Sequence, residues 1–250
     1  MDIEHPLTGG NATASVVRVG ATVRKPWTAK TALVRDFLEH VRARGVDAPA
    51  PLGRDDRGRQ ILEFVPGAEP GVLDADDLHR IGRLIRSIHD AASSFPFQET
   101  DAWDVLLPAP DEPELICHGD LTPWNLIVGE RWVFIDWDGA GPSTRLWDLA
   151  YSASAFALND PAQDPEEVRL RLAALVDGYD ADDRMRAALP AMMARRTRAM
   201  HRMLERAHER GDEPWGSMYV EGHGAHWRAV AEYVSTHESV WRDSLLRPAR

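Results

Sequence analysis

The sequence predicts an α+β protein, with a small β-rich unit over residues 1–66 followed by a larger, mainly helical unit over residues 67–250. Two observations support this prediction. Short runs of β-branched residues that end at glycine or proline dominate the first unit, and long segments with apolar residues at helical spacing dominate the second. The chain has 250 residues, 44% of them hydrophobic and 28% charged. This composition is typical of globular proteins and excludes an intrinsically disordered chain.

The first unit contains signals for three strands and one helix. We expect these elements at Val16–Val19, Thr22–Arg24, Thr31–Arg44 (the helix) and Arg59–Val65. Gly20 provides the tight turn between the first two strands, and Gly45 ends the helix. Pro49 and Pro51 predict a loop before the last strand.

In the second unit, a β-rich stretch interrupts the helices. We expect strands at Leu115–Cys117, Asn125–Val128 and Trp132–Ile135, and helices at 76–92, 146–157, 165–178, 182–210 and 217–245. Polar residues follow these apolar strands directly, so the strands would hold them firmly beside a cleft.

Charge and cysteine content narrow the function classes. Asp and Glu exceed Lys and Arg by 40 to 29, a net charge of −11 that argues against nucleic acid as the main partner. No apolar run approaches the roughly 18 residues that span a bilayer, and the N-terminus lacks the pattern of a secretory signal. The lone cysteine, Cys117, cannot form an internal disulfide, so we expect a cytoplasmic protein. The acidic balance favours a neutral or cationic ligand, whereas the arginine-rich stretch 185–210 is equally compatible with an anionic one.

The clearest chemical signal is a group of oxygen-bearing side chains at the ends of the central strands. Asp120 and Asn125 are five residues apart in a loop that contains Pro123, and Asp136 follows the next strand. Because a short hairpin connects them, we expect Asp136 to return toward Asn125. Two carboxylates and one amide oxygen that converge on one point suit a hard divalent cation such as Mg²⁺.

These residues also carry a family resemblance. His118-Gly119-Asp120, then Asn125, and then Ile135-Asp136-Trp137 resemble the signature of the aminoglycoside phosphotransferase and choline kinase-like phosphotransferase family, distant relatives of protein kinases. The resemblance covers residues 115–151 and includes Trp147-Asp148-Leu149-Ala150. It implies a two-lobed protein-kinase-like fold, in which residues 1–66 form the nucleotide-binding N-lobe. Residues 67–250 would form the C-lobe, with the catalytic loop, the metal site and the acceptor-binding helices.

The resemblance implies a small-molecule kinase that moves the γ-phosphate of ATP, or of GTP, to an alcohol hydroxyl with the help of Mg²⁺. By this resemblance Asp120 is the catalytic base, and Asn125 and Asp136 hold Mg²⁺. His118 would brace the catalytic loop, and Asp148 would hydrogen-bond to that loop from behind.

On the nucleotide side, the resemblance implies two sets of phosphate contacts. Gly9 and Gly10 would belong to a phosphate-covering loop, where glycine allows backbone N–H groups to approach the phosphates. A strand cation should reach the α- and β-phosphates. Strand alternation places Lys25 on the same face as Val23, so Lys25 is favoured, with Arg24 as the alternative.

The resemblance also implies an acidic partner for this cation and a connection between the lobes that binds adenine. Asp36 and Glu39 are both candidates for the acid, on the helix predicted at Thr31–Arg44. Glu63 and Val65 lie where the lobes connect, and their backbone would bind the adenine edge.

The sequence leaves the acceptor open among an aminoglycoside, another amino sugar, an amino alcohol and a metabolite hydroxyl. In this superfamily, carboxylates of the C-terminal part often bind cationic acceptors. The candidates here are Asp138, Asp160, Glu205, Glu209, Glu213 and Glu221.

Two other functions remain as alternatives. The first is a catalytically silent nucleotide-binding protein with an immunity, sensor or scaffold role. The second is a metal-dependent hydrolase, which is disfavoured because the histidines do not occur at the spacing of metal ligands. The sequence does not indicate the oligomeric state.

Overall fold

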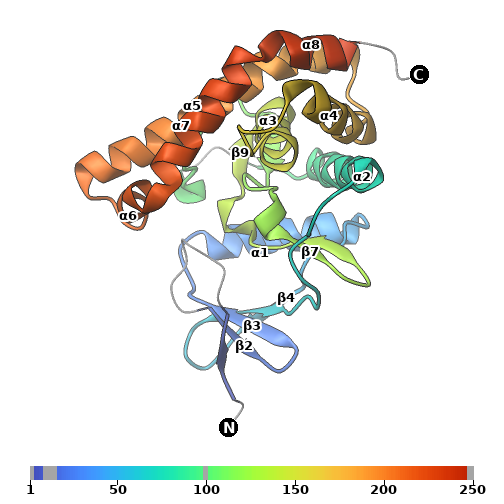
Figure 1. Cartoon of the computed structure of the whole chain (residues 1–250). Helices are drawn as coiled ribbons and strands as arrows, with labels where there is room; N and C mark the ends of the chain where they lie inside the picture. Colours follow the sequence, from blue (N-terminus) through green and yellow to red (C-terminus); the bar gives the residue numbers. More distant parts are fainter. Residues whose placement is uncertain (1–2, 8–15, 98–100, 247–250) are drawn as a thin grey trace.

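The computed structural model describes residues 3–7, 16–97 and 101–246, which form a two-lobed α+β fold (Figure 1). The small lobe, at the bottom of the view, contains an antiparallel sheet of five strands in the order β1-β2-β3-β5-β4. Its elements are β1 (His5–Pro6), β2 (Val17–Val19), β3 (Thr22–Lys25), α1 (Thr31–Ala43), β4 (Pro51–Arg54) and β5 (Gln60–Glu63). The strands and the helix expected in this part are therefore present, with ends shifted by a few residues.

Strand β4 begins at Pro51, within a stretch for which Pro49 and Pro51 predicted a loop. Pro51 begins this strand at the edge of the sheet, where a missing N–H removes no bond between paired strands. The pairing register shifts between Pro51 and Gly53, and Gly53 has a φ of 103°. The loop prediction therefore holds at Pro49 and was wrong from Pro51 onward, because an edge strand with an irregularity tolerates both Pro51 and Gly53.

The large lobe consists mainly of helices and carries two short pairs of strands (Figure 1). The helices are α2 (Ala75–Ala92), α3 (Arg145–Ala157), α4 (Pro165–Tyr179), α5 (Asp183–Arg210), α6 (Trp215–Met218), α7 (Gly224–Thr236) and α8 (Glu238–Leu246). The pairs are β6 (Leu115–Cys117) with β9 (Gly141–Ser143), and β7 (Leu126–Val128) with β8 (Trp132–Phe134). Strand β9, whose Gly-Pro-Ser sequence lacks a strand signal, was not predicted. Among the described helices, none is long and apolar enough to cross a membrane.

The single helix predicted at 217–245 is divided into three segments. A wide turn at Tyr219–His223 separates α6 from α7, and Gly222 within this turn has a φ of 114°, which interrupts the helix. A second break follows Thr236, before α8 begins at Glu238. The periodic apolar residues continue through both breaks, so the pattern did not reveal them. The first break brings the turn to the edge of the cavity described below.

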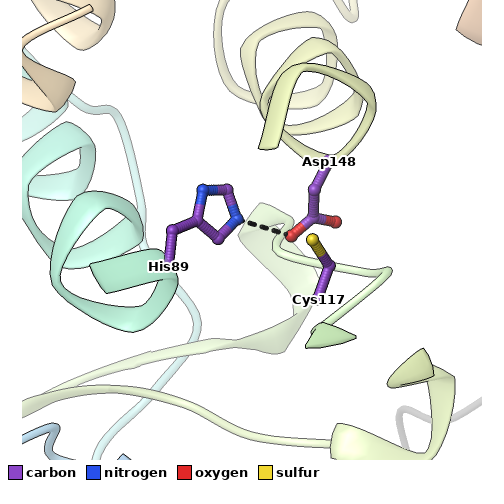
Figure 2. Close-up of side chains that lie close together, drawn as sticks. All are labelled: His89, Cys117 and Asp148. Carbon is purple, nitrogen blue, oxygen red and sulfur yellow. Dashed lines mark hydrogen bonds and ion pairs between the residues drawn. The ribbon is translucent and has the colours of Figure 1, made fainter. Parts of the chain in front are cut away.

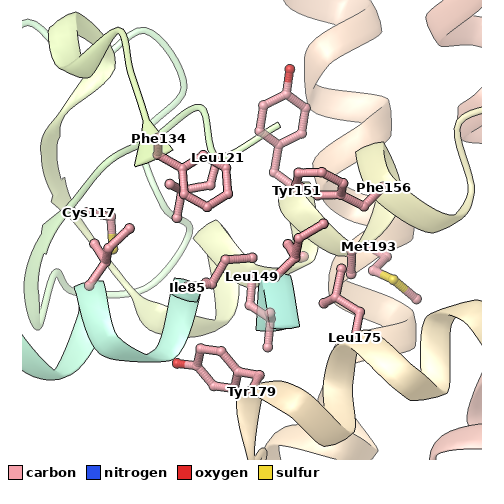
Figure 3. Packing of buried hydrophobic residues seen from close by; sticks show 14 of the residues in the cluster. Ile85, Cys117, Leu121, Phe134, Leu149, Tyr151, Phe156, Leu175, Tyr179 and Met193 are labelled. Atoms are coloured by element: carbon pink, nitrogen blue, oxygen red, sulfur yellow. The ribbon is translucent and has the colours of Figure 1, made fainter. Parts of the chain in front are cut away.

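Helices α2 and α4 approach closely because each has a glycine at the contact. A Cβ atom on Gly178 would lie 2.0 Å from the carbonyl oxygen of His79, and one on Gly82 would lie 2.1 Å from that of Leu175. The adjoining core extends from these helices to strands β6, β7 and β8, and Figure 3 shows Leu149 and Tyr179 within it. This core lies beneath the loop that follows β6.

We expect Gly178→Ala to destabilise the protein. The added methyl group would overlap a backbone carbonyl that cannot move independently of α2, and overpacking of this kind costs about 1–3 kcal/mol. Urea unfolding followed by circular dichroism measures the change. Gly71→Ala is the matched control, because a Cβ atom there meets open space. Equal unfolding free energies for the two variants would contradict the close approach of α2 and α4.

Candidate active site

The loop that follows β6 carries Asp120, and its path depends on one glycine. Gly119 has a φ of 83°, and a Cβ atom at this position would lie 2.6 Å from the carbonyl oxygen of Gly139. Only glycine combines this conformation with so close an approach. The approach brings the Asp120 loop against the short helical turn Trp137–Gly139, which immediately follows Asp136.

The hairpin β7–β8 brings Asn125 and Asp136 together, as the spacing predicted. The two strands pair Leu126 with Phe134, and the N–H of Ile135 donates to the carbonyl oxygen of Asn125 at 2.8 Å. Asp136 follows directly, in a left-handed conformation with a φ of 59° that turns the chain out of the hairpin. Asn125 and Asp136 both line a cavity of about 720 Å³, as does Asp120.

The buried ring of His118 connects the two segments that carry these residues. The N–H of Asp120 donates to His118 Nδ1 at 3.2 Å, and His118 Nε2 lies 3.1 Å from the carbonyl oxygen of Ile135. This pattern assigns the proton to Nε2 of a neutral ring. Burial lowers the pKa of His118, which agrees with the neutral form. His118 therefore holds the Asp120 loop against the end of the β7–β8 hairpin.

A buried hydrogen-bonded group lies behind the same loop (Figure 2). Asp148 Oδ1 accepts the N–H of Gly119 at 3.1 Å, and Asp148 Oδ2 lies 3.0 Å from His89 Nε2. The other ring nitrogen of His89 lies 2.9 Å from the hydroxyl of Tyr179. The group links α2, α3 and α4 to the backbone of the catalytic loop.

Cys117 lies beside this group, and the potential ligand atoms of Cys117, His89 and Asp148 are all within 4.8 Å of one another. Protein groups already occupy both ring nitrogens of His89 and both carboxylate oxygens of Asp148. Burial and the neighbouring Asp148 carboxylate raise the pKa of the Cys117 thiol well above its usual value. These three residues therefore act as a packed support of the loop rather than as a metal site.

The carboxylate of Asp120 is largely enclosed. Its Oδ2 accepts a hydrogen bond from Asn125 Nδ2 at 2.8 Å, and its Oδ1 is buried without a hydrogen-bond partner among the described residues. Burial, together with the nearby Asp136 carboxylate, raises the pKa of Asp120 from 3.8 to about 6. An enclosed carboxylate with a free oxygen and a raised pKa is suited to accept a proton.

Lys25, at the end of β3, is 6% exposed and joins the small lobe to these carboxylates. Its Nζ lies 2.5 Å from Asp136 Oδ1 and 2.7 Å from Asp138 Oδ2. Burial alone would lower the pKa of Lys25, but Asp138 and Asp136 outweigh burial and raise it. Arg24 lies apart from them and pairs with Asp55 at 3.6 Å. Of the two candidates for the strand cation, the structure brings only Lys25 to the site.

The expected helix acid does not pair with this lysine. Asp36 and Glu39 are both exposed on α1, and Asp36 forms its ion pair with Arg35. In the described part of the chain, the ion-pair partners of Lys25 are Asp136 and Asp138. These two carboxylates already balance the charge of Lys25. The expectation that Lys25 pairs with an acid of α1 was therefore wrong.

The structure describes two of the four other residues that were expected to bind the nucleotide, Glu63 and Val65. Gly9 and Gly10 lie outside the described residues. The carboxylate of Glu63 accepts hydrogen bonds from the N–H of Ala50 and from Arg131, which comes from the turn between β7 and β8. Glu63 thus links the lobes through its side chain, and Val65 is buried just after β5.

The cavity lies against the helices of the large lobe and contains features that the sequence did not single out. Of the six acidic residues that the sequence analysis named as candidates for acceptor binding, Asp138 and Glu221 line the cavity. Asp104 also lines the cavity, although the sequence analysis did not name it. Arg196 and Tyr151 also line it. The signal for Arg196 was its position in the buried stripe of α5, three residues after Met193.

Comparison with known proteins places the chain in a family. Residues 90–189 match the phosphotransferase enzyme family. The chain is 30% identical over 237 residues to the trifolitoxin immunity protein of Rhizobium leguminosarum bv. trifolii, and the match covers 86% of this chain and 87% of that protein. The chain therefore belongs to the phosphotransferase enzyme family, as the resemblance predicted, and we identify it as a phosphotransferase.

Solved structures confirm the kinase-like fold. A choline/ethanolamine kinase family protein from Mesorhizobium loti is 20% identical, with a TM-score of 0.60 over 96% of this chain and 92% of that one. An amicoumacin kinase in complex with AMP-PNP and Ca²⁺ is 13% identical, with a TM-score of 0.62 over 90% and 87%. A microcompartment-associated aminopropanol kinase is 17% identical, with a TM-score of 0.61 over 98% and 94%.

We expect Asp120→Asn to stabilise the metal-free protein at neutral pH. The folded pKa of about 6 exceeds the unfolded value of 3.8, so the folded state binds the proton more tightly and ionisation above pH 6 costs stability. The cost at pH 7.5 is up to about 3 kcal/mol. Urea unfolding in EDTA measures it. The gain of the variant should shrink below pH 6 and vanish near pH 4, and a gain that does not vary with pH would contradict the raised pKa.

Proposed function

We propose that this phosphotransferase moves the γ-phosphate of Mg-ATP to a hydroxyl group of a small molecule. The observation that carries the proposal is that Asp120, Asn125 and Asp136 line one cavity, next to the buried Lys25. Phosphoryl transfer depends mainly on positioning the reactants and on neutralising charge. These four side chains offer a proton acceptor, oxygen ligands and a cation. In this proposal residues 1–66 bind the nucleotide, and residues 67–250 carry the catalytic loop and the acceptor pocket.

A divalent cation fits the donors at this position. Asn125 Nδ2 donates to both the backbone and the side-chain oxygen of Asp120, which leaves Asn125 Oδ1 available as a ligand. Asp136 adds a carboxylate, and Mg²⁺ prefers one or two carboxylates together with phosphate oxygens and water. We assign Asn125 and Asp136 to Mg²⁺, which supplies charge neutralisation at the phosphates when it is bound.

The nucleotide contacts follow from the small lobe. We assign Lys25 to the α- and β-phosphates because it is a buried cation beside the metal-binding carboxylate. Gly9 and Gly10 are assigned to the loop over the phosphates. The adenine edge is assigned to the backbone of Glu63 and Val65, where the chain leaves β5 toward the large lobe.

Asp120 is the proposed base. As the acceptor oxygen forms its bond to the γ-phosphorus, its O–H bond breaks and the proton passes to Asp120. The bond between the γ-phosphorus and the β,γ-bridging oxygen breaks with its electron pair on ADP. A pKa of about 6 keeps Asp120 ionised at neutral pH and makes it more basic than an ordinary aspartate. His118 and Asp148 position its loop through hydrogen bonds to the backbone.

The acidic side chains in the cavity support an acceptor that carries an amine. Asp104 and Glu221 lie along its lining and favour a cationic group, whereas the third acid of this set, Asp138, already pairs with Lys25. An aminoglycoside-like molecule, an amino sugar and an amino alcohol all combine an ammonium group with a hydroxyl, and we propose this class.

A second candidate function is that of a catalytically silent nucleotide-binding protein that confers immunity to a toxin. It is favoured by the relative named an immunity protein, which is 30% identical over most of both chains. The two candidates differ in turnover. A silent immunity protein would bind the nucleotide without consuming it in the presence of any acceptor, whereas the enzyme would release ADP when an acceptor is added.

We expect Asp120→Asn to lower turnover by roughly 10²- to 10⁴-fold, because the acceptor hydroxyl loses its proton acceptor. Binding of Mg-ATP should remain largely intact. A coupled ADP-release assay with a panel of aminoglycosides, amino alcohols and sugars measures turnover, and isothermal titration measures binding. Wild-type turnover in the variant would exclude Asp120 as the base. ATP binding without turnover in the wild-type protein would favour the silent immunity role.

We expect Asp136→Ala to abolish the part of ATP-induced thermal stabilisation that depends on Mg²⁺, because the variant lacks a metal ligand. A thermal-shift assay with ATP, with and without Mg²⁺, measures the difference. Glu209→Ala serves as the control, since Glu209 is an exposed acid of α5 outside the cavity lining. An unchanged response to Mg²⁺ in Asp136→Ala would remove Asp136 from the metal site.

A further inference from the structure

One arginine of the large lobe is buried and has no ionic partner among the residues that the structure describes. Arg196, on α5, is 4% exposed. Its Nε and Nη1 atoms are enclosed, and neither has a hydrogen-bond partner among the described residues. The ion pairs of the described chain also do not include Arg196, so no carboxylate oxygen there lies within 4.0 Å of its guanidinium. A buried charge without a partner is costly unless a ligand completes its environment.

The guanidinium is held in place by aromatic rings. It lies 3.9 Å from the ring centre of Tyr151 and 5.3 Å from that of Trp147. Both aromatic residues are buried on α3, where Trp147 precedes and Tyr151 follows Asp148, the residue that accepts the N–H of Gly119. These contacts fix the orientation of the guanidinium but satisfy none of its N–H donors, because ring faces attract the cation without accepting conventional hydrogen bonds.

Arg196 lines the same cavity as Asp120 and Asn125. It is also close enough to Asp120 for their charges to interact, since Asp120 opposes the lowering of the Arg196 pKa that burial causes. Even so, the two groups form no ion pair. Asp120 Oδ1 and the two arginine nitrogens therefore remain as unpaired buried polar atoms around one cavity.

The neighbouring arginines of α5 have a different environment. Arg195, Arg198 and Arg202 are exposed, and they line a second groove, which adjoins the cavity at Leu107 and Trp147. Arg196 is thus the arginine of this stretch that points into the cavity of the catalytic loop. Its burial distinguishes it from a solvated charge on the surface of a helix.

We propose that Arg196 binds a carboxylate of the acceptor, so that the acceptor is a small molecule with both a carboxylate and the hydroxyl that is phosphorylated. A guanidinium offers parallel N–H donors that match the two oxygens of a carboxylate. The acidic residues Asp104 and Glu221 elsewhere in the lining favour an ammonium group on the same molecule. This inference rests on the proposed function, because it takes the cavity as the acceptor site.

The experiment compares hydroxy amino acids with matched compounds that lack the carboxylate charge. The probes are L-serine, L-homoserine and L-threonine, their methyl esters, and the amino alcohols ethanolamine and 3-amino-1-propanol. Two readouts are used for each: thermal stabilisation without nucleotide, and kcat/KM from ADP release with Mg-ATP. The proteins are the wild type, Arg196→Gln, Arg196→Lys and the control Arg198→Gln, which alters an exposed arginine of the same helix.

We expect at least one free acid to stabilise the wild-type protein more than its ester, and to react with a kcat/KM on the order of 10²-fold higher, as expected for a charge-assisted hydrogen bond. Arg196→Gln should abolish this preference, Arg196→Lys should retain part of it, and Arg198→Gln should retain all of it. If Arg196→Gln does not fold, the test is made with Arg196→Lys, whose preference for the free acid over its methyl ester should be smaller than that of the wild type. Retention of Mg-ATP stabilisation in the Arg196 variants separates loss of acceptor binding from damage to the nucleotide site.

Three outcomes would overturn the inference. The first is a panel in which no free acid is preferred to its ester by the wild-type protein. The second is a preference for acids that survives in the Arg196 variants. The third is an equal fall of kcat for acids, esters and amino alcohols, which would assign Arg196 to the transferred phosphoryl group. Carboxylate binding that depends on Arg196 but gives no ADP release would contradict the proposed function, and would leave only the binding of a carboxylate by Arg196 supported.

Discussion

The active site depends on the buried carboxylate of Asp148. One of its oxygens accepts the N–H of Gly119, and the other lies 3.0 Å from His89 of α2 (Figure 2). The carboxylate thereby joins two helices to the backbone of the loop that carries Asp120. A buried charge of this kind is stable only while all its partners are present, so it holds the loop in one position. His118 continues the same connection to the end of the β7–β8 hairpin.

Close to Asp148 and His118, the protein buries charged side chains whose polar atoms are not all paired with other described residues. Within the described part of the chain, one buried oxygen of Asp120 and two buried nitrogens of Arg196 have no hydrogen-bond partner, although both residues line the same cavity. The small lobe contributes Lys25, which joins two carboxylates of the large lobe. Natural proteins retain such costs where a site must bind charged groups, and a phosphotransferase handles phosphate, metal and acceptor at once.

Local patterns predicted much of the fold and failed where distant residues intervene. Strand β5 and helices α2 and α5 have strong periodicity and were predicted within a few residues. Strand β9 forms only because β6 lies opposite it, and its Gly-Pro-Ser sequence has no strand preference of its own. The break at Gly222 lies in a stretch whose apolar pattern continues unchanged, so local periodicity did not reveal it.

The sequence by itself determined that His118, Asp120, Asn125 and Asp136 lie at one place in the fold, because their spacing is local and a short hairpin is enough to bring them together. Only the tertiary structure decided which charges meet across the molecule. Lys25 lies 111 residues before Asp136, and the contact between them replaces the expected pairing with an acid of α1. The environment of Arg196 likewise depends on how α5 packs against α3. Ion pairing and burial depend on distances through space, and the spacing of residues along the chain does not specify those distances.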